Sequence, residues 1–241
     1  MNVNESASGA PPTSTVLIVG ASRGLGLGLA EEYLSRGWNV IATVRSPTAE
    51  CADLVDAGNK FAGNLRIERV DTTQPEQITA LRNALTGTRL AALVVNAGIQ
   101  NHHREKIGEV SSDIFNQVMV SNALGPLRIV EACADLVVGG GVIAVMSSYM
   151  GSVSLNTTGD NEVYRASKAA LNSLLRSFAA RDTGNHAFIA LHPGWVRTEM
   201  GGERAPLDIA TSVRGCVDVL SAQSGQPGVR FLNYKGEILA W

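Results

Sequence analysis

Short apolar and β-branched runs alternate with longer helical patterns along this chain, and that alternation restricts the fold more than any other feature. TVLIVG and RLAALVVNAG, for example, are apolar almost without a break. An unbroken apolar run predicts a strand buried on both faces, which is typical of parallel sheets covered by helices. The expected strands span residues 15–20, 39–45, 65–71, 89–98, 140–148 and 186–194, and the expected helices 26–37, 74–86, 112–137 and 162–181. The pattern predicts an α/β fold, a single Rossmann-like doubly wound parallel sheet with helices on both faces.

Length, composition and charge narrow the class of protein. The chain has 241 residues, which fits one large α/β domain or two small ones, and 45% of them are hydrophobic, enough for a substantial core. We expect a disordered polar leader over residues 1–14 and a single domain over residues 15–241. A net charge of −2 argues against nucleic acid as a partner. No apolar run approaches the length of about 18 residues that spans a membrane, and three widely spaced cysteines suit the reducing cytoplasm.

Three glycines fall where the first strand is expected to meet the first helix. Gly20, Gly24 and Gly26 lie in VGASRGLGLG, with the spacing GxxxGxG instead of the commoner GxGxxG. Glycine permits a tight turn and a close approach of backbone to a ligand, and the following helix N-terminus attracts a diphosphate. A plain tight turn is the alternative. Placement directly after a buried strand favours a nucleotide site.

A tyrosine and a lysine share one face of the helix expected around EVYRASKAALNSLLRS. Tyr164 and Lys168 lie four residues apart, and residues at that spacing are neighbours on a helix surface. On these two residues alone, a surface tyrosine packed over a lysine stem is the simpler interpretation. The other motifs decide between this and a catalytic pair.

Several motifs, in order, resemble the short-chain dehydrogenase/reductase family. VGASRGLG (19–26) resembles that family's TGxxxGxG loop, VNAG (95–98) its NNAG segment, YRASK (164–168) its YxxxK motif and HPGWVRT (192–198) its PG segment. Val19 and Val95 replace the usual threonine and asparagine. The resemblance covers residues 15–241. It is closest to the sniffer/C-factor-like carbonyl reductase branch, through the segments PGWVRTEMGG and FLNYKGEILAW.

The resemblance implies a nicotinamide cofactor, and the residues after the second strand bear on its identity. An NAD-preferring site usually places an acid there, whereas TVRSP offers Arg45, and Arg23 adds a cation inside the glycine loop. Guanidinium groups suit a 2′-phosphate, so we predict NADP(H), with two merely solvated arginines as the alternative. By resemblance, the cofactor contacts are Gly20, Ser22, Arg23, Gly24, Leu25, Gly26, Arg45, Asp71, Asn96, Ala97, Gly98, Tyr164, Lys168, Pro193, Gly194, Val196 and Thr198.

The resemblance also implies a catalytic set made of Asn122, Ser148, Tyr164 and Lys168. Hydride transfer to a carbonyl leaves negative charge on oxygen, and a donor placed there stabilises the transition state. Tyr164 would donate the proton, and we expect the Lys168 ammonium to lower its pKa from the usual value near 10. Lys168 would also hold the nicotinamide ribose. Ser148 would hold the substrate oxygen, with Ser147 as the competing candidate, and Asn122 would join through a water relay to the lysine.

The substrate side is less defined. Loops 99–112, 149–163 and 199–208 would contact a small carbonyl or alcohol, and the interval from Ser148 to Tyr164 is longer than in many family members. The short third loop suggests an open mouth that tolerates varied ketones or aldehydes. Four large side chains either line an apolar pocket there or belong to the core: Tyr149, Met150, Trp195 and Met200. His102 and His103 have no further ligands at suitable spacing, so we expect no metal site.

These observations predict an NADP(H)-dependent oxidoreductase that reduces a ketone or aldehyde to an alcohol, or performs the reverse reaction. The alternative is a regulatory or signalling protein that senses NADP(H) with little or no turnover, and a structural scaffold is a third possibility. We expect a cytoplasmic homodimer or homotetramer, with helices 112–137 and 162–181 as its interface, and no partnership with nucleic acid or membrane.

Overall fold

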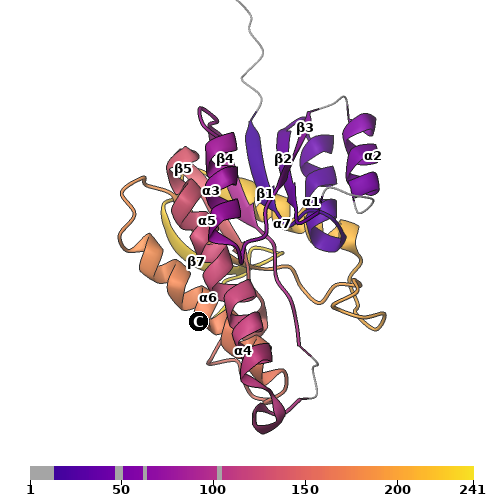
Figure 1. The fold of residues 1–241 in the computed structure, drawn as a ribbon, viewed down its shortest axis with the longest axis vertical. Coiled ribbons are helices and arrows are strands. Elements are labelled where there is room, and N and C mark those ends of the chain that lie inside the picture. Colours follow the sequence, from indigo (N-terminus) through magenta and orange to yellow (C-terminus); the bar gives the residue numbers. More distant parts are fainter. Residues whose placement is uncertain (1–13, 47–50, 62–63, 102–104) are drawn as a thin grey trace, which may run out of the picture.

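Seven parallel strands form one sheet in the computed structural model, which describes residues 14–46, 51–61, 64–101 and 105–241 (Figure 1). The strand order is β3-β2-β1-β4-β5-β6-β7. Their bounds are Thr15–Val19 (β1), Asn39–Val44 (β2), Leu65–Arg69 (β3), Leu90–Val95 (β4), Val137–Met146 (β5), Ala187–His192 (β6) and Gly228–Asn233 (β7). The order reverses between β1 and β4, which places a ligand crevice at their carboxyl ends. The predicted Rossmann-like α/β fold is confirmed.

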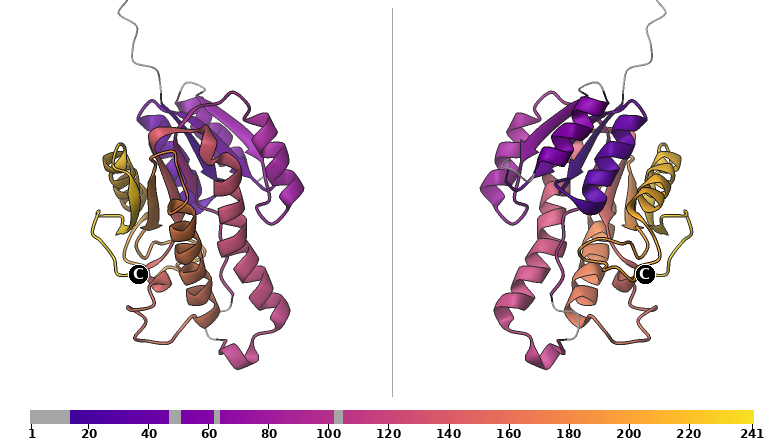
Figure 2. Two further views of the ribbon diagram at one scale, coloured as in Figure 1. Left: turned by 90° about the vertical axis from the view of Figure 1, so that its left-hand side faces the viewer. Right: turned by 90° about the vertical axis from the view of Figure 1, so that its right-hand side faces the viewer.

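Helices cover both faces of this sheet (Figure 2). Their bounds are Gly24–Ser35 (α1), Ala52–Lys60 (α2), Pro75–Ala84 (α3), Ser112–Met119 (α4), Gly125–Cys133 (α5), Glu162–Ala179 (α6) and Ile209–Gln223 (α7). Side chains alternate along β1, so that Val16 and Ile18 pack with α1, α2 and α7, while Leu17 and Val19 pack with α3, α5 and α6. Two separate cores result, one on each face, as the unbroken apolar strands predict.

The predicted helix over residues 112–137 has an irregular centre. A π-helical turn, Val120–Leu124, separates α4 from α5, and β5 already begins at Val137. Widened turns of this kind are frequent at functional sites. In both side views α4 and α6 extend beyond the sheet (Figure 2), and they flank the end at which the strands finish.

Three elements were not predicted from the sequence: α2, α7 and β7. Their patterns are weaker: α2 combines polar residues with a glycine, and β7 includes a glycine, an arginine and an asparagine among its six residues. Of the expected leader, only Ser14 lies within the described residues. His102 and His103 also lie outside the described residues. Within the described ranges, no helix is long and apolar enough to cross a bilayer.

Candidate active site

The glycine loop packs directly against the segment that follows β4. Gly20 has a positive φ of 87°, and a Cβ added there would lie 3.0 Å from Ala97. At Gly26 an added Cβ would lie 2.0 Å from the Gly20 carbonyl oxygen and 2.7 Å from Nδ2 of Asn96. That amide nitrogen donates a 2.8 Å hydrogen bond to the Gly20 carbonyl. Any side chain would disrupt this packing, so the loops after β1 and β4 form one close-packed floor.

The first turn of α1 is open to an anion. The helix begins at Gly24, and the preceding Arg23 makes no side-chain cap to its N–H groups. Such N–H groups have no partner within the helix and attract negative charge. Thr43, buried in β2, fixes the loop by accepting a 3.1 Å hydrogen bond from the Gly20 N–H. The arrangement fits a dinucleotide diphosphate. Sequence reasoning missed Thr43, although a lone polar residue in an apolar strand was a usable signal.

The remaining residues expected around the adenosine end lie at the carboxyl ends of β1, β2 and β3. Arg45 follows β2 and is exposed. Arg23 forms an ion pair with Glu199, and the two side chains are 71% and 76% exposed. Asp71 accepts hydrogen bonds from the Thr73 N–H and hydroxyl, at 2.9 and 2.7 Å. Two further expected contacts are partly buried in the same glycine loop and first turn, Ser22 and Leu25.

The segment after β6 is held tightly beside this loop. Gly194 has a φ of 89°, and an added Cβ would lie 2.4 Å from Cδ1 of Leu207. The Pro193 carbonyl accepts a 2.6 Å hydrogen bond from the Ser212 hydroxyl of α7. Val196 is buried, and Thr198 caps the next turn by accepting from the Gly201 N–H at 3.0 Å. A Cβ added to Gly24 would lie 3.8 Å from Cγ2 of Thr198, so the predicted nicotinamide-side segment faces the glycine loop.

The four-residue spacing in α6 brings Tyr164 and Lys168 together. Lys168 Nζ lies 5.7 Å from the centroid of the Tyr164 ring and donates a 2.7 Å hydrogen bond to the Met146 carbonyl at the end of β5. The lysine is 3% exposed, and burial lowers its pKa from 10.5 to about 8. A Cβ at Gly98 would lie 3.4 Å from this Nζ and 3.2 Å from Oδ1 of Asn122. Glycine at this position therefore leaves space beside both groups.

The pKa of Tyr164 moves in the direction opposite to our expectation. Although the residue is only partly buried, the protein around its hydroxyl raises the pKa to about 12, because burial disfavours the charged phenolate. The nearby Ser148 side chain opposes this shift. The prediction that Lys168 lowers the phenol pKa into the working range is wrong for this geometry. The phenol stays protonated at neutral pH.

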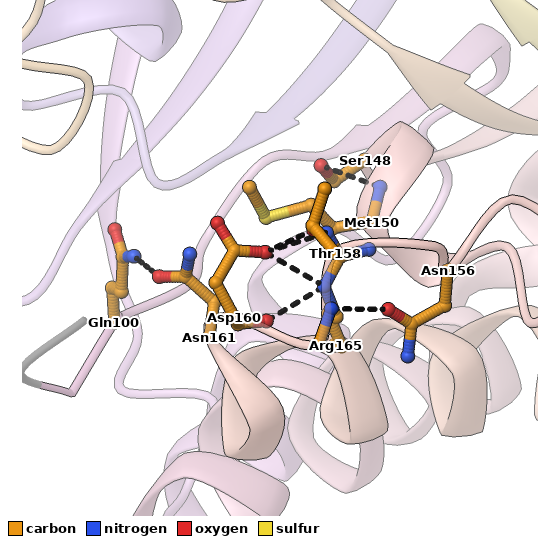
Figure 3. A network of polar contacts seen from close by, with 9 residues as sticks. Gln100, Ser148, Met150, Asn156, Thr158, Asp160, Asn161 and Arg165 are labelled. Atoms are coloured by element: carbon orange, nitrogen blue, oxygen red, sulfur yellow. Dashed lines mark hydrogen bonds and ion pairs between the residues drawn. The ribbon is translucent and has the colours of Figure 1, made fainter. Parts of the chain in front are cut away.

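The two candidate serines point to different partners. The Ser147 hydroxyl is buried and donates a 2.7 Å hydrogen bond to Oδ1 of Asn172. Ser148 instead acts on the pKa of the Tyr164 hydroxyl. It also accepts a 3.2 Å hydrogen bond from the Met150 N–H (Figure 3). The geometry therefore favours Ser148 as the serine beside the phenol.

Asn122 lies within the π-helical turn and is fully buried. Its Nδ2 donates to the Ile99 carbonyl at 2.8 Å and to the Ser167 hydroxyl at 3.0 Å, and its Oδ1 accepts from the Ile99 N–H at 2.7 Å. These bonds fix the segment after β4 against α6. The widened turn is what places the amide across from Lys168.

The large side chains left undecided by the sequence are mostly on the surface. Tyr149, Trp195 and Met200 are 38%, 53% and 48% exposed, and Met150 is half-buried. The first three are therefore not core residues. His192, at the end of β6, packs against Tyr149 in an edge-type arrangement with the two ring centroids 5.4 Å apart. Burial lowers the pKa of His192 to about 4, so it is neutral.

Comparisons with known proteins agree with this geometry. A family model described as short chain dehydrogenase matches residues 14–207. A short-chain dehydrogenase/reductase from Burkholderia multivorans with bound NADP superposes with a TM-score of 0.92 at 48% identity, over 95% of this chain and all of that one. For a carbonyl reductase from Pseudomonas aeruginosa in complex with NADP, the corresponding values are 0.88 and 38%, with the same coverage.

Two further matches bear on the branch of the family that the sequence motifs indicated. The carbonyl reductase Sniffer of D. melanogaster has a TM-score of 0.82 at 30% identity, over 95% of this chain and all of that one. The C-signal protein of Myxococcus xanthus is 37% identical over 163 residues, which cover 66% of this chain and 96% of that protein. Both agree with the predicted resemblance.

Proposed function

The chain belongs to the short-chain dehydrogenase/reductase family, and from that premise we propose that it is an NADP(H)-dependent reductase of ketones or aldehydes. One observation carries the proposal: the Tyr164 hydroxyl lies near enough to the Ser148 hydroxyl for this serine to act on its pKa, and Tyr164 shares one face of α6 with the buried Lys168. Two neighbouring hydroxyls, those of Tyr164 and Ser148, can both hydrogen-bond to a single carbonyl oxygen. A glycine-lined floor that fits a dinucleotide lies beside them.

The NADP(H) assignment is supported by the solved relatives that hold NADP and by the charges at the adenosine end. Arg45 and Arg23 are the residues that would meet the 2′-phosphate. Arg23 would have to exchange its Glu199 partner for the phosphate, which is feasible because an exposed ion pair contributes only about 0 to 1 kcal/mol. The first turn of α1 would hold the diphosphate, and Lys168 would hold the nicotinamide ribose.

The proposed chemistry follows from the protonation states. The bound nicotinamide supplies a hydride to the substrate carbon. Tyr164 donates its phenolic proton to the carbonyl oxygen as negative charge develops there, and Ser148 holds the same oxygen. A phenol with a pKa of about 12 is protonated at neutral pH, which is the state that the proposed proton transfer to a carbonyl oxygen requires. Lys168 fixes the end of β5 through its hydrogen bond to the Met146 carbonyl, and Asn122 fixes the segment after β4 against α6.

Exposure supports the proposals on substrate and assembly. The exposed apolar parts of Tyr149, Trp195 and Met200 favour apolar ketones or aldehydes as substrates. Ile114 on α4 and Leu174 on α6 are 37% and 41% exposed, which supports the expected homodimer or homotetramer through these helices. A cytoplasmic location remains part of the proposal.

The test is a panel of carbonyl compounds assayed by NADPH oxidation, with Tyr164→Phe as the diagnostic variant. We expect turnover to fall by about two to four orders of magnitude in this variant, with NADPH affinity retained. Tyr33→Phe removes a phenol buried in α1 on the other face of the sheet and serves as the matched control. Near-normal turnover by Tyr164→Phe contradicts the assigned role.

The alternative is an NADP(H)-sensing protein, and the similarity to C-signal is the observation that keeps it in view. Tight NADPH binding without turnover of any carbonyl in the panel would support the sensor. Binding of neither nucleotide would reject both functions.

A further inference from the structure

Arg165 follows Tyr164 in the sequence but lies on another face of α6. It is 5% exposed, which is unusual for a charged side chain. Its Nε donates to the Asp160 carbonyl at 2.7 Å, and its Nη2 donates to Oδ1 of Asp160 at 2.7 Å and to the Thr158 hydroxyl at 2.9 Å. A buried guanidinium is tolerated only when it is paired in this way. Arg165 thus ties α6 to the segment just before it, as Figure 3 shows.

The same guanidinium also supports an aromatic side chain next to the proposed catalytic serine. Cζ of Arg165 lies 5.9 Å from the centroid of the Tyr149 ring, and the His192 ring packs against Tyr149 in an edge-type arrangement with the two ring centroids 5.4 Å apart. Nη1 of Arg165 is buried and makes no hydrogen bond with the described residues, so the ring face supplies part of its compensation. Tyr149 directly follows Ser148 in the sequence, and its ring contacts both Arg165 and His192.

The segment that Arg165 ties down is the long interval of the substrate side, residues 149–161. Its first part has a separate anchor, because the Ser154 hydroxyl donates to the Trp241 carbonyl at 2.9 Å. Its last residue, Asn161, has a φ of 55° and accepts a 2.6 Å hydrogen bond from Nε2 of Gln100 in the loop after β4. The loop after β4 and loop 149–161 therefore meet at the start of α6. Arg165 holds the stretch between these two anchors.

We propose that Arg165 is a positioning residue that fixes loop 149–161 and the Tyr149 ring, and thereby determines which carbonyl compounds the site accepts. The inference rests on the proposed reductase function. Arg165 does not touch the reacting atoms but acts through Tyr149. Arginine is required because its planar fork bridges Asp160 and Thr158 while its face meets the ring, which the point charge of lysine cannot do.

The experiment compares kcat/KM for a small aliphatic ketone and a bulky aryl ketone in Arg165→Lys, Asp160→Asn and the double variant. We expect the ratio of the two values to change by about tenfold in each single variant, mainly through KM. The double variant should show little further change, because both substitutions break one connection. NADPH affinity should stay at the wild-type level. Arg181→Gln, which removes an exposed arginine paired with Glu131 near the end of α6, is the matched control.

Tyr149→Ala and Tyr149→Phe separate this role from general stability. Tyr149 is 38% exposed, so its variants should fold. The alanine variant should reproduce the altered substrate ratio, and the phenylalanine variant should keep the wild-type ratio because the ring remains. A wild-type ratio in Arg165→Lys and Tyr149→Ala, with normal turnover of both ketones, overturns the inference. A wild-type protein that turns over no carbonyl at all overturns the reductase proposal instead.

Discussion

Replacing Lys168 by methionine should change how the stability of the protein depends on pH. The lysine is buried, and burial lowers its pKa from 10.5 to about 8. The folded protein therefore binds this proton less tightly than the unfolded chain does. Between about pH 8 and pH 10.5 the unfolded chain holds more protons, so the free energy of unfolding rises with pH in that interval. Methionine keeps a side chain of similar length but has no such proton.

The magnitude follows from the size of the shift. One pKa unit corresponds to about 1.4 kcal/mol, so the shift of Lys168 amounts to about 3 kcal/mol of destabilisation, fully present below pH 8. Loss of the hydrogen bond from Nζ to the Met146 carbonyl, worth about 1.5 to 3 kcal/mol for a charged donor, offsets much of the gain in the variant at neutral pH. The pH dependence is the cleaner measurement, because that offset does not remove it.

The assay is urea unfolding at about pH 7 and about pH 10, with the difference taken between wild type and variant. The free energy of unfolding of the wild type should rise by about 2 to 3 kcal/mol more than that of Lys168→Met over this range. Lys106→Met, at an exposed lysine, should follow the wild-type curve. Lys168→Met should also lose NADPH binding. Equal pH dependence in wild type and Lys168→Met would refute the argument that this lysine is buried at an energetic cost.

Three further predictions concern the same site. Ser148→Ala should lower kcat by about 10²- to 10³-fold. Ser147→Ala should leave kcat near normal but lower the free energy of unfolding by about 1 to 3 kcal/mol, because the Asn172 amide loses its buried partner. Steady-state kinetics and urea unfolding of both variants check this pair. Glu199→Gln should tighten NADPH up to about fivefold, since it releases Arg23 from an exposed ion pair, and should leave NADH nearly unchanged in fluorescence titrations; an equal effect on both nucleotides would contradict it. Alcohol oxidation should rise with pH well above neutrality, because it needs the phenolate of Tyr164, while reduction stays level through neutral pH; a pH-rate profile that plateaus near neutrality for oxidation would contradict the raised pKa.

The sequence predicted the sheet and the glycine loop well because both depend on local signals. Unbroken apolar runs are specific for doubly covered strands, and Gly20 and Gly26 lie where only glycine fits. Helices α2 and α7 and strand β7 were missed because their patterns are short or mixed and their stability comes from packing against α1 and β6. The four-residue spacing of Tyr164 and Lys168 also gave their proximity correctly, since helix geometry alone decides it.

What the sequence could not give is the balance between burial and charge. From spacing alone, the ammonium of Lys168 is the obvious perturbation on Tyr164. In the structure the lysine is itself buried and donates to a backbone carbonyl, and desolvation raises the phenol pKa instead of lowering it. The connection from Arg23 to Glu199 spans 176 residues, and no local pattern predicts a partner at that distance.

The opposed pKa shifts of Tyr164 and Lys168 have a common origin in burial, and together they set the protonation state from which the proposed reaction starts. Desolvation favours the neutral form of each group, so the phenol of Tyr164 keeps its proton and the amine of Lys168 binds its proton less tightly. Taking a proton from an alcohol needs the phenolate of Tyr164, which burial disfavours at neutral pH. A site that gives a proton to a carbonyl oxygen needs a phenol that is protonated at neutral pH and a neighbour, here Ser148, that stabilises the phenolate once the proton has left. The burial of these two side chains therefore leaves Tyr164 in the protonated state that the proposed transfer to a carbonyl oxygen needs at neutral pH.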